Sequence, residues 1–122
     1  MKCIGIDLGG TGIKVGIVDE QNKIIYKLSC PTGVERGYEA VIHDMAQLTI
    51  RAINESGVPM AEIESIGIGI PGIYDAKRNI VPFCTNLFWR EVPLVQLMQK
   101  EIDKPIFVGN DASVAEIGRA HV

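Results

Sequence analysis

Three short segments at the start of the chain alternate apolar residues with residues of other kinds. The segments are Lys2 to Leu8, Ile13 to Val18 and Lys23 to Ser29, and a period of two predicts a β-strand for each of them. A glycine-rich stretch separates the first two, and the polar residues 19–22 separate the last two. Because short turns join antiparallel neighbours, these segments predict a three-stranded meander.

The pattern then changes to a helical period. From about Gly37 to Glu55, apolar residues recur every three to four positions. This spacing predicts an amphipathic helix that packs one stripe of side chains on a sheet. Gly57 and Pro59 follow and are expected to end the helix.

The second half of the chain predicts two more strands and two more helices. Ser65 to Ile70 alternates isoleucine with glycine, and a strand with glycine on one face allows a neighbouring element to approach closely. An irregular segment follows it. The remaining elements are a helix from Pro93 to Ile102, a strand from Ile106 to Gly109 and a helix from Ala112 to Ala120. The predicted order is β-β-β-α-β-α-β-α, an α/β arrangement.

Length, charge and composition indicate one ordinary compact domain. The chain has 122 residues, a hydrophobic fraction of 47% and a formal net charge of −3. Residues of both signs are interspersed, so neither nucleic acid nor a membrane surface is an expected partner. No apolar run approaches the ~18 residues of a membrane-spanning helix, and the chain opens on a strand rather than a signal peptide, which favours the cytoplasm. Cys3, Cys30 and Cys84 are widely spaced and are expected to be free thiols.

The turn between the first two strands carries the clearest candidate chemistry. Glycines at positions 9, 10 and 12 lack a Cβ, so the turn can adopt positive φ and bring its N–H groups close to phosphate oxygens. Thr11 adds a hydroxyl, Lys14 adds a positive charge, and Asp7 is placed to hold Mg²⁺ directly or through water. A β-rich run follows where a Walker or dinucleotide loop would open a helix. The alternative is a structural hairpin whose glycines serve only the turn.

Polar or glycine-containing residues also follow the two later strands. Pro71-Gly72 ends one strand and Asn110-Asp111 ends the other, and ligands in open α/β sheets collect at such strand ends. Asp111 is a candidate general base, although Asp is equally favoured as the N-cap of a following helix. Asn110 can donate to and accept from a vicinal diol, and it is also a common turn residue.

A polar and aromatic cluster, Thr85-Asn86-Leu87-Phe88-Trp89, lies in the irregular segment. Asn86 and Trp89 could supply a hydrogen-bonding side chain and an apolar wall to a sugar pocket. Trp89 could instead fill the edge of the core. His43 is expected to be a solvated helical residue without a functional role.

Four separated motifs together resemble the amino-terminal half of the ROK family of sugar kinases and related repressors. They are Asp7-Leu8-Gly9-Gly10-Thr11-Gly12-Ile13-Lys14, Gly67-Ile68-Gly69-Ile70-Pro71-Gly72, Asn86-Leu87-Phe88-Trp89 and Asn110-Asp111-Ala112-Ser113. The resemblance covers essentially the whole chain. It implies an actin-like, ribonuclease-H-like ATPase domain with a mixed sheet, in which residues 1–122 are the amino-terminal lobe of a two-lobe sugar kinase.

The resemblance also implies a division of the site into two regions. The residues of the phosphate and Mg²⁺ region of an ATP site would be Asp7, Gly9, Gly10, Thr11 and Lys14, with Asp7 at the metal. The residues facing a hexose would be Gly72, Asn86, Asn110 and Asp111, with Thr85 as a weaker neighbour. Asp111 would be the catalytic base that activates the acceptor hydroxyl.

Other features expected of the family would follow Val122, including further sugar contacts and the lobe that holds the adenosine. The chain is therefore expected to be truncated and to be inactive alone. The full-length protein is expected to be a homo-oligomer. Two other functions remain open. One is a sugar-sensing transcriptional regulator, which would carry a DNA-binding segment before the first strand, where this chain has none. The other is a chaperone-like or cytoskeletal ATPase, which would share only the first motif.

Overall fold

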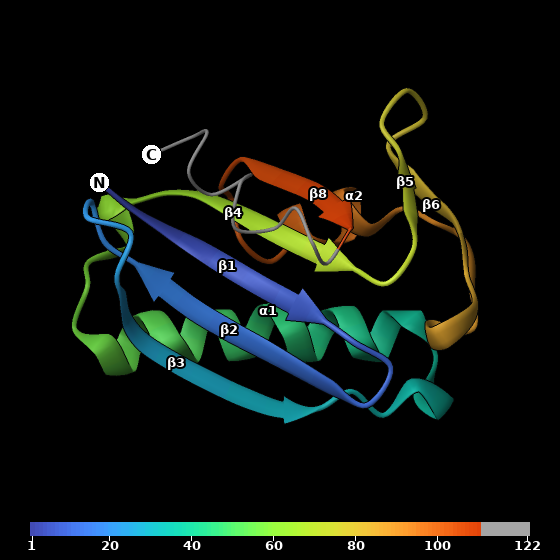
Figure 1. Cartoon of the computed structure of the whole chain (residues 1–122), viewed down its shortest axis with the longest axis horizontal. Helices are drawn as coiled ribbons and strands as arrows, with labels where there is room; N and C mark the ends of the chain where they lie inside the picture. Colours follow the sequence, from blue (N-terminus) through green and yellow to red (C-terminus); the bar gives the residue numbers. More distant parts are fainter. Residues whose placement is uncertain (111–122) are drawn as a thin grey trace.

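The computed structural model describes residues 1–110. Within them the chain forms a five-stranded sheet, a second sheet of three short strands and two α-helices (Figure 1). Asp111 and the predicted helix from Ala112 to Ala120 lie outside the described residues.

The larger sheet is mixed, with the order β3-β2-β1-β4-β8. Its strands are β1 (Lys2–Leu8), β2 (Gly12–Val18), β3 (Ile24–Pro31), β4 (Ile63–Ile70) and β8 (Ile106–Asn110). β2 runs antiparallel to β1 and β3, which confirms the predicted meander. β4 is parallel to β1, and β8 is parallel to β4. The parallel strands β1, β4 and β8 therefore have their carboxyl ends at the same edge of the sheet.

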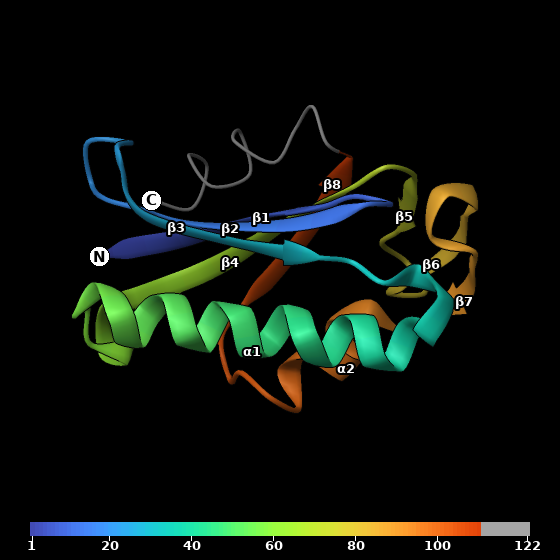
Figure 2. The same cartoon turned by 90° about the horizontal axis from the view of Figure 1, so that it is seen from below.

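Both α-helices lie on one face of this sheet (Figure 2). α1 spans Tyr38–Ser56, close to the predicted bounds, whereas α2 spans only Leu94–Gln99, the central part of the segment predicted as helix. Two short 3-10 turns, η1 (Val34–Arg36) and η2 (Met60–Glu62), precede α1 and β4. None of the helices within residues 1–110 combines the length and the apolar composition that a bilayer crossing requires.

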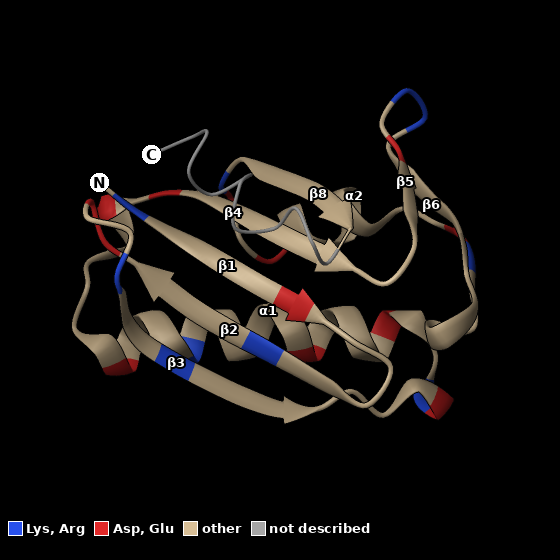
Figure 3. Ribbon diagram, viewed as in Figure 1, with Lys and Arg blue, Asp and Glu red and all other residues tan. Residues whose placement is uncertain are grey.

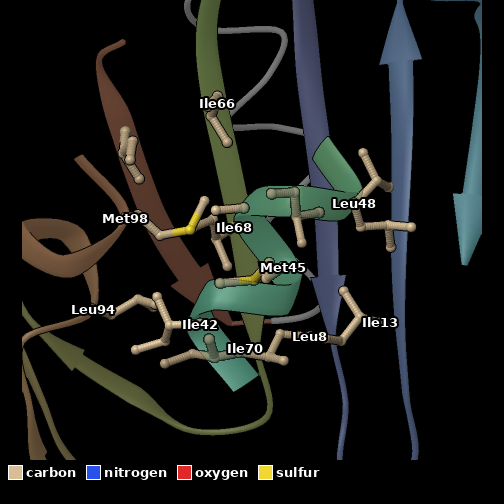
Figure 4. Close-up of a cluster of buried hydrophobic side chains, with 14 of the residues drawn as sticks. Leu8, Ile13, Ile42, Met45, Leu48, Ile66, Ile68, Ile70, Leu94 and Met98 are labelled. Carbon is tan, nitrogen blue, oxygen red and sulfur yellow. The ribbon is translucent and has the colours of Figure 1, made fainter. Parts of the chain in front are cut away.

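The core lies between the sheet and the two helices (Figure 4). Ile68 and Ile70 of β4 are completely buried, as is Met45 of α1. Because side chains alternate along a strand, the glycines Gly67 and Gly69 take the opposite face of β4. The alternation of isoleucine and glycine in the sequence therefore separates the helix-covered face from the other face of the sheet.

The second sheet is a correction to the predicted order β-β-β-α-β-α-β-α, which omits its three strands. They are β5 (Ile73–Asp75), β6 (Ile80–Cys84) and β7 (Trp89–Val92), with the 3-10 turn η3 (Thr85–Leu87) between the last two. Their burial does not alternate cleanly, and Phe83 is 58% exposed. The alternation of apolar and polar residues that would predict a strand is therefore missing from this part of the sequence. The small sheet lies beyond the carboxyl end of β4 (Figure 1).

A tyrosine links the outer strand β3 to α1. The hydroxyl of Tyr26 donates to Glu55 Oε1 at 2.6 Å, and Arg51 Nε donates to Glu55 Oε2 at 2.7 Å. The hydrogen bond from Tyr26, followed by that from Arg51, holds the pKa of Glu55 below its ordinary value of 4.5. Because the folded-state pKa is lowered, this carboxylate stabilises the fold above pH 4.5, and the contribution is lost as the pH falls through the lower folded-state pKa.

Tyr26→Phe is therefore expected to lower stability more at neutral pH than in acid. Without the hydroxyl, the pKa of Glu55 in the folded state returns toward its ordinary value. The difference in urea midpoint between the variant and the wild type should be larger at about pH 7 than at about pH 3. Tyr38→Phe is the matched control, because the Tyr38 hydroxyl makes no hydrogen bond within residues 1–110. An equal difference at both pH values would remove this role from Tyr26.

Candidate functional site

The carboxyl ends of the three parallel strands define the candidate site. The register pairs Asp7 of β1 with Gly69 of β4, and Gly69 with Gly109 of β8. Gly72 lies just after the end of β4, and Asn110 is the last residue of β8. The structure therefore brings Asp7, Gly72 and Asn110 to one edge of the sheet, where ligands of α/β sheets bind.

Asp7 and Lys14 face each other across the first hairpin. They are Cα partners in the antiparallel register of β1 and β2, and both side chains are exposed. Exposure follows from the strand alternation, which places their neighbours Leu8 and Ile13 in the core. Within residues 1–110 neither Asp7 nor Lys14 makes an ion pair or a side-chain hydrogen bond. A carboxylate and an ammonium group are thus available side by side, which suits a phosphate and its cation.

Residues 9–11, here called the glycine turn, connect β1 to β2. The expectation of positive φ at its glycines and at Gly12 is wrong, since the described glycines with positive φ are at positions 33, 37 and 57. Glycine is favoured here because other backbone atoms lie too close to leave room for a side chain. The Gly9 N–H donates to the Gly12 carbonyl oxygen at 2.9 Å, and a Cβ on Gly9 would lie 3.3 Å from that oxygen.

Two donors of the glycine turn remain available to a ligand. In the described part of the chain, no hydrogen bond takes up the N–H of Gly10 or of Thr11. The side chain of Thr11 is exposed and also makes no hydrogen bond there. Neighbouring backbone N–H groups in a turn form a concave site for an anion.

The glycine turn touches the segment that carries Asn86. A Cβ on Gly10 would lie 3.1 Å from the carbonyl oxygen of Asn86 and 3.6 Å from its Cβ. Gly72 contacts the same segment, since its Cβ would lie 3.3 Å from Cys84 Sγ. The side chains of Thr85 and Asn86 are exposed at this point. The residues expected near phosphate and those expected near sugar thus meet, although they are far apart in the sequence.

The remaining candidates are placed as follows. Trp89, expected either to line a sugar pocket or to fill the core, is 3% exposed and fills the core. His43 is solvated on α1, where its Nδ1 lies 2.7 Å from Glu101 Oε1. Asp111 directly follows Asn110 but lies outside the described residues, so its role stays a prediction.

Sequence reasoning missed one residue of the site, Thr32. Its side chain is completely buried, and its hydroxyl donates to the carbonyl oxygen of Gly9 at 2.6 Å. The segment Pro31-Thr32-Gly33 directly follows the third predicted strand, and its proline and glycine predict only a break in the pattern. The sequence does place a threonine directly after the third strand, at the end of the meander that lies next to the first turn. That position alone does not predict which group the hydroxyl would bind.

The chemistry of the donors fits Mg²⁺ better than a transition metal. Among the described residues no three His, Cys, Asp or Glu side chains gather at metal-binding distance. At this edge of the sheet Asp7 offers an exposed carboxylate that has no ion pair or hydrogen bond within residues 1–110, and Mg²⁺ is commonly bound through one or two carboxylates together with phosphate oxygens. The cysteines are free thiols, as predicted. Burial, and secondarily Asp44, raises the pKa of the Cys30 thiol, which keeps it protonated at neutral pH.

The sequence profile of the ROK family matches residues 3–122. The chain belongs to the ROK family. The glucokinase of Thermotoga maritima is 38% identical over 119 residues, which are 97% of this chain and 36% of the relative. The xylose repressor of Caldicellulosiruptor bescii is 26% identical over 96% of this chain and 29% of its own length. This ROK chain thus spans about a third of the length of such relatives.

Solved ROK structures share the fold. The ROK glucokinase from Streptomyces griseus, crystallised with glucose and AMPPNP, aligns with a TM-score of 0.82 and 30% identity over 99% of this chain and 36% of its own length. The ROK hexokinase from Thermus thermophilus aligns with a TM-score of 0.81 and 34% identity over 93% of this chain and 36% of its own. The predicted actin-like ATPase class with a mixed sheet is confirmed. Acidic and basic segments are interspersed over the described ribbon of this ROK chain (Figure 3).

Proposed function

We propose that this chain is the amino-terminal lobe of a two-lobe, ATP-dependent hexose kinase. The observation that carries the proposal is the contact between the glycine turn and the segment of Asn86, where a Cβ on Gly10 would lie 3.1 Å from the Asn86 carbonyl oxygen. A kinase must hold the transferred phosphoryl group beside the acceptor hydroxyl. A phosphate-binding turn that touches a sugar-binding segment meets that requirement.

In this proposal the glycine turn and its flanking strands bind the phosphates of ATP. The N–H groups of Gly10 and Thr11 and the Thr11 hydroxyl donate to phosphate oxygens, Gly9 allows the close backbone approach, and Lys14 contributes a positive charge. Asp7 would hold Mg²⁺, which when bound offsets the charge of the phosphates. The exposed, unpaired state of Asp7 and Lys14 supports this assignment.

The hexose would lie against Gly72, Asn86 and Asn110, with Thr85 nearby. Asn86 and Asn110 each carry an amide that both donates and accepts, which matches the vicinal hydroxyls of a sugar. Asp111 takes the proton of the acceptor hydroxyl while the oxygen of that hydroxyl attacks the γ-phosphorus of ATP. The bond from this phosphorus to the departing ADP oxygen then breaks. Asp111 follows Asn110 in the sequence, and Asn110 ends β8 at the edge of the sheet where Asp7 also lies, which supports this role.

One lobe cannot enclose ATP and sugar or exclude water from the transfer, so the chain alone is inactive in this proposal. Glucose is the first-choice substrate, and the relatives named glucokinase support it. N-acetylmannosamine, N-acetylglucosamine, fructose and β-glucosides follow. The full-length protein would be a cytoplasmic homo-oligomer without a nucleic-acid partner.

An ATP-coupled assay of the full-length protein against this panel of hexoses tests the proposal. We expect ADP release that depends on one of these sugars, with glucose the best substrate. Sugar-independent ATP hydrolysis with nucleotide-driven polymerisation would favour the actin-like ATPase alternative.

A second function, a sugar-sensing regulator, is favoured by the relatives named xylose repressor. A regulator binds a sugar effector without phosphoryl transfer. Sugar binding by calorimetry, together with no turnover in the coupled assay, would decide for the regulator.

A further inference from the structure

One backbone hydrogen bond crosses the glycine turn, from the Gly9 N–H to the Gly12 carbonyl, but the reverse bond is missing. In a closed β-turn the N–H of the fourth residue donates to the carbonyl of the first. Here the first residue is Gly9 and the fourth is Gly12, and within residues 1–110 the Gly12 N–H makes no hydrogen bond to the Gly9 carbonyl. The Gly9 carbonyl instead accepts from the Thr32 hydroxyl at 2.6 Å. A residue that follows the third strand therefore supplies the hydrogen bond that the turn lacks.

Thr32 binds the glycine turn at two points. Besides its hydroxyl bond to Gly9, its N–H donates to the Thr11 carbonyl at 3.1 Å. The two carbonyl groups thus both point toward Thr32. In a trans peptide the C=O and the following N–H point in opposite directions, and the described chain has no cis peptide. The Gly10 N–H, which follows the Gly9 carbonyl, is therefore directed away from Thr32.

Thr32 is itself connected to α1 through the side chain of Arg36. Its carbonyl accepts from Arg36 Nη2 at 2.8 Å, and the same nitrogen lies 2.8 Å from Asp44 Oδ2 on α1. Arg36 also donates through Nε to the Gly33 carbonyl at 3.2 Å. Gly33 has a φ of 65°, and a Cβ there would lie 2.6 Å from Arg36 Nε, so only glycine allows the arginine to fold back in this way.

We propose that Thr32 is a positioning residue that directs the Gly10 N–H of the glycine turn toward the phosphates of the nucleotide. The proposal rests on the proposed function. Because Thr32 is completely buried, it acts through the turn rather than by touching ATP. The pair Arg36–Asp44 anchors it to the core helix, so the turn keeps its shape when no nucleotide is bound.

The test compares Thr32→Val, which keeps the shape and removes the hydroxyl, with Thr32→Ser, which keeps the hydroxyl and removes a methyl group. In the full-length protein, Thr32→Val should raise KM for ATP by about tenfold, because the Gly9 carbonyl loses its partner and the Gly10 N–H loses its fixed direction. KM for the sugar should change much less. Thr32→Ser should stay within about twofold of the wild-type KM for ATP.

Amide hydrogen exchange supplies a readout that does not depend on turnover. The amide of Gly9, which donates to the Gly12 carbonyl, should exchange faster in Thr32→Val than in the wild type and in Thr32→Ser. An unchanged KM for ATP in Thr32→Val, or an equal defect in Thr32→Ser, would overturn the proposal. If the wild type phosphorylates no hexose, the proposed function fails, and the exchange comparison still decides whether the hydroxyl holds the turn.

Arg36→Leu provides a second variant in case Thr32→Val does not fold. It removes the anchor of the Thr32 carbonyl at a side chain that is 40% exposed. We expect about a threefold rise in KM for ATP. Arg51→Leu is the matched control, since it breaks an exposed ion pair within α1, between Arg51 and Glu55, away from the turn. Equal effects of the two arginine changes would contradict the role of Thr32.

Discussion

If Asp111 is the general base that we propose, its replacement with asparagine is expected to lower kcat of the full-length protein by at least ~100-fold, because general acid–base catalysis contributes about 10²–10⁴ to the rate. Asparagine has nearly the same shape and can still hydrogen-bond a sugar hydroxyl, but it cannot take the proton. KM for the sugar should therefore change little. The coupled assay with glucose and ATP, together with sugar binding by calorimetry, separates the two effects.

Asp103→Asn is the control for this substitution. Asp103 is an exposed carboxylate that precedes β8, as Asp111 follows it. The control should retain wild-type turnover. Unchanged kcat in Asp111→Asn would remove Asp111 from the role of base, and a matching loss in Asp103→Asn would attribute the effect to general charge or folding.

Gly10→Val is expected to lower kcat/KM by about 100-fold, since a displacement of about 1 Å at an active site can cost that much. Even a Cβ on Gly10 would lie 3.1 Å from the Asn86 carbonyl oxygen, which is backbone and cannot move aside alone. The two further methyl groups of valine must then separate the glycine turn from the segment of Asn86. Both KM for ATP and KM for the sugar should rise, because the substitution separates the two halves of the site.

Gly5→Val tests whether this effect is local. Gly5 is also a glycine of the amino-terminal hairpin, on β1, but a Cβ there would meet no atom within 4 Å. Its kinetic constants should stay close to those of the wild type. Near-normal activity in Gly10→Val would show that the contact with Asn86 is not required for transfer.

Local periodicity predicted most of the larger sheet and α1. The first strand and the meander follow from an alternation that burial then confirms, with Ile4, Ile6 and Leu8 in the core. The small sheet could not be predicted in this way. Its strands are short, β6 contains Pro82, and Phe88 between β6 and β7 has a φ of 56°. Proline and left-handed residues normally indicate turns rather than strands.

The pairing of Asp7 with Lys14 could be predicted, because one short turn fixes the register of the hairpin. The contact of Gly10 with Asn86 could not, since it depends on how the small sheet packs beyond β4. The hydrogen bond from Thr32 to Gly9 spans 23 positions of the sequence. Such contacts arise from tertiary packing, on which a local pattern of apolar and polar residues carries no information.

The location of β1 between β2 and β4 also bears on the order in which the chain folds. β2 follows β1 after a short turn, whereas β4 pairs with β1 only after β3 and α1 have intervened. The entropic cost of closing a loop rises with its length, and pairing between distant segments slows folding. The meander is therefore expected to assemble early. The proposed nucleotide half of the site would then be shaped during synthesis, before Asn86 and Asn110 are added to complete the proposed sugar half.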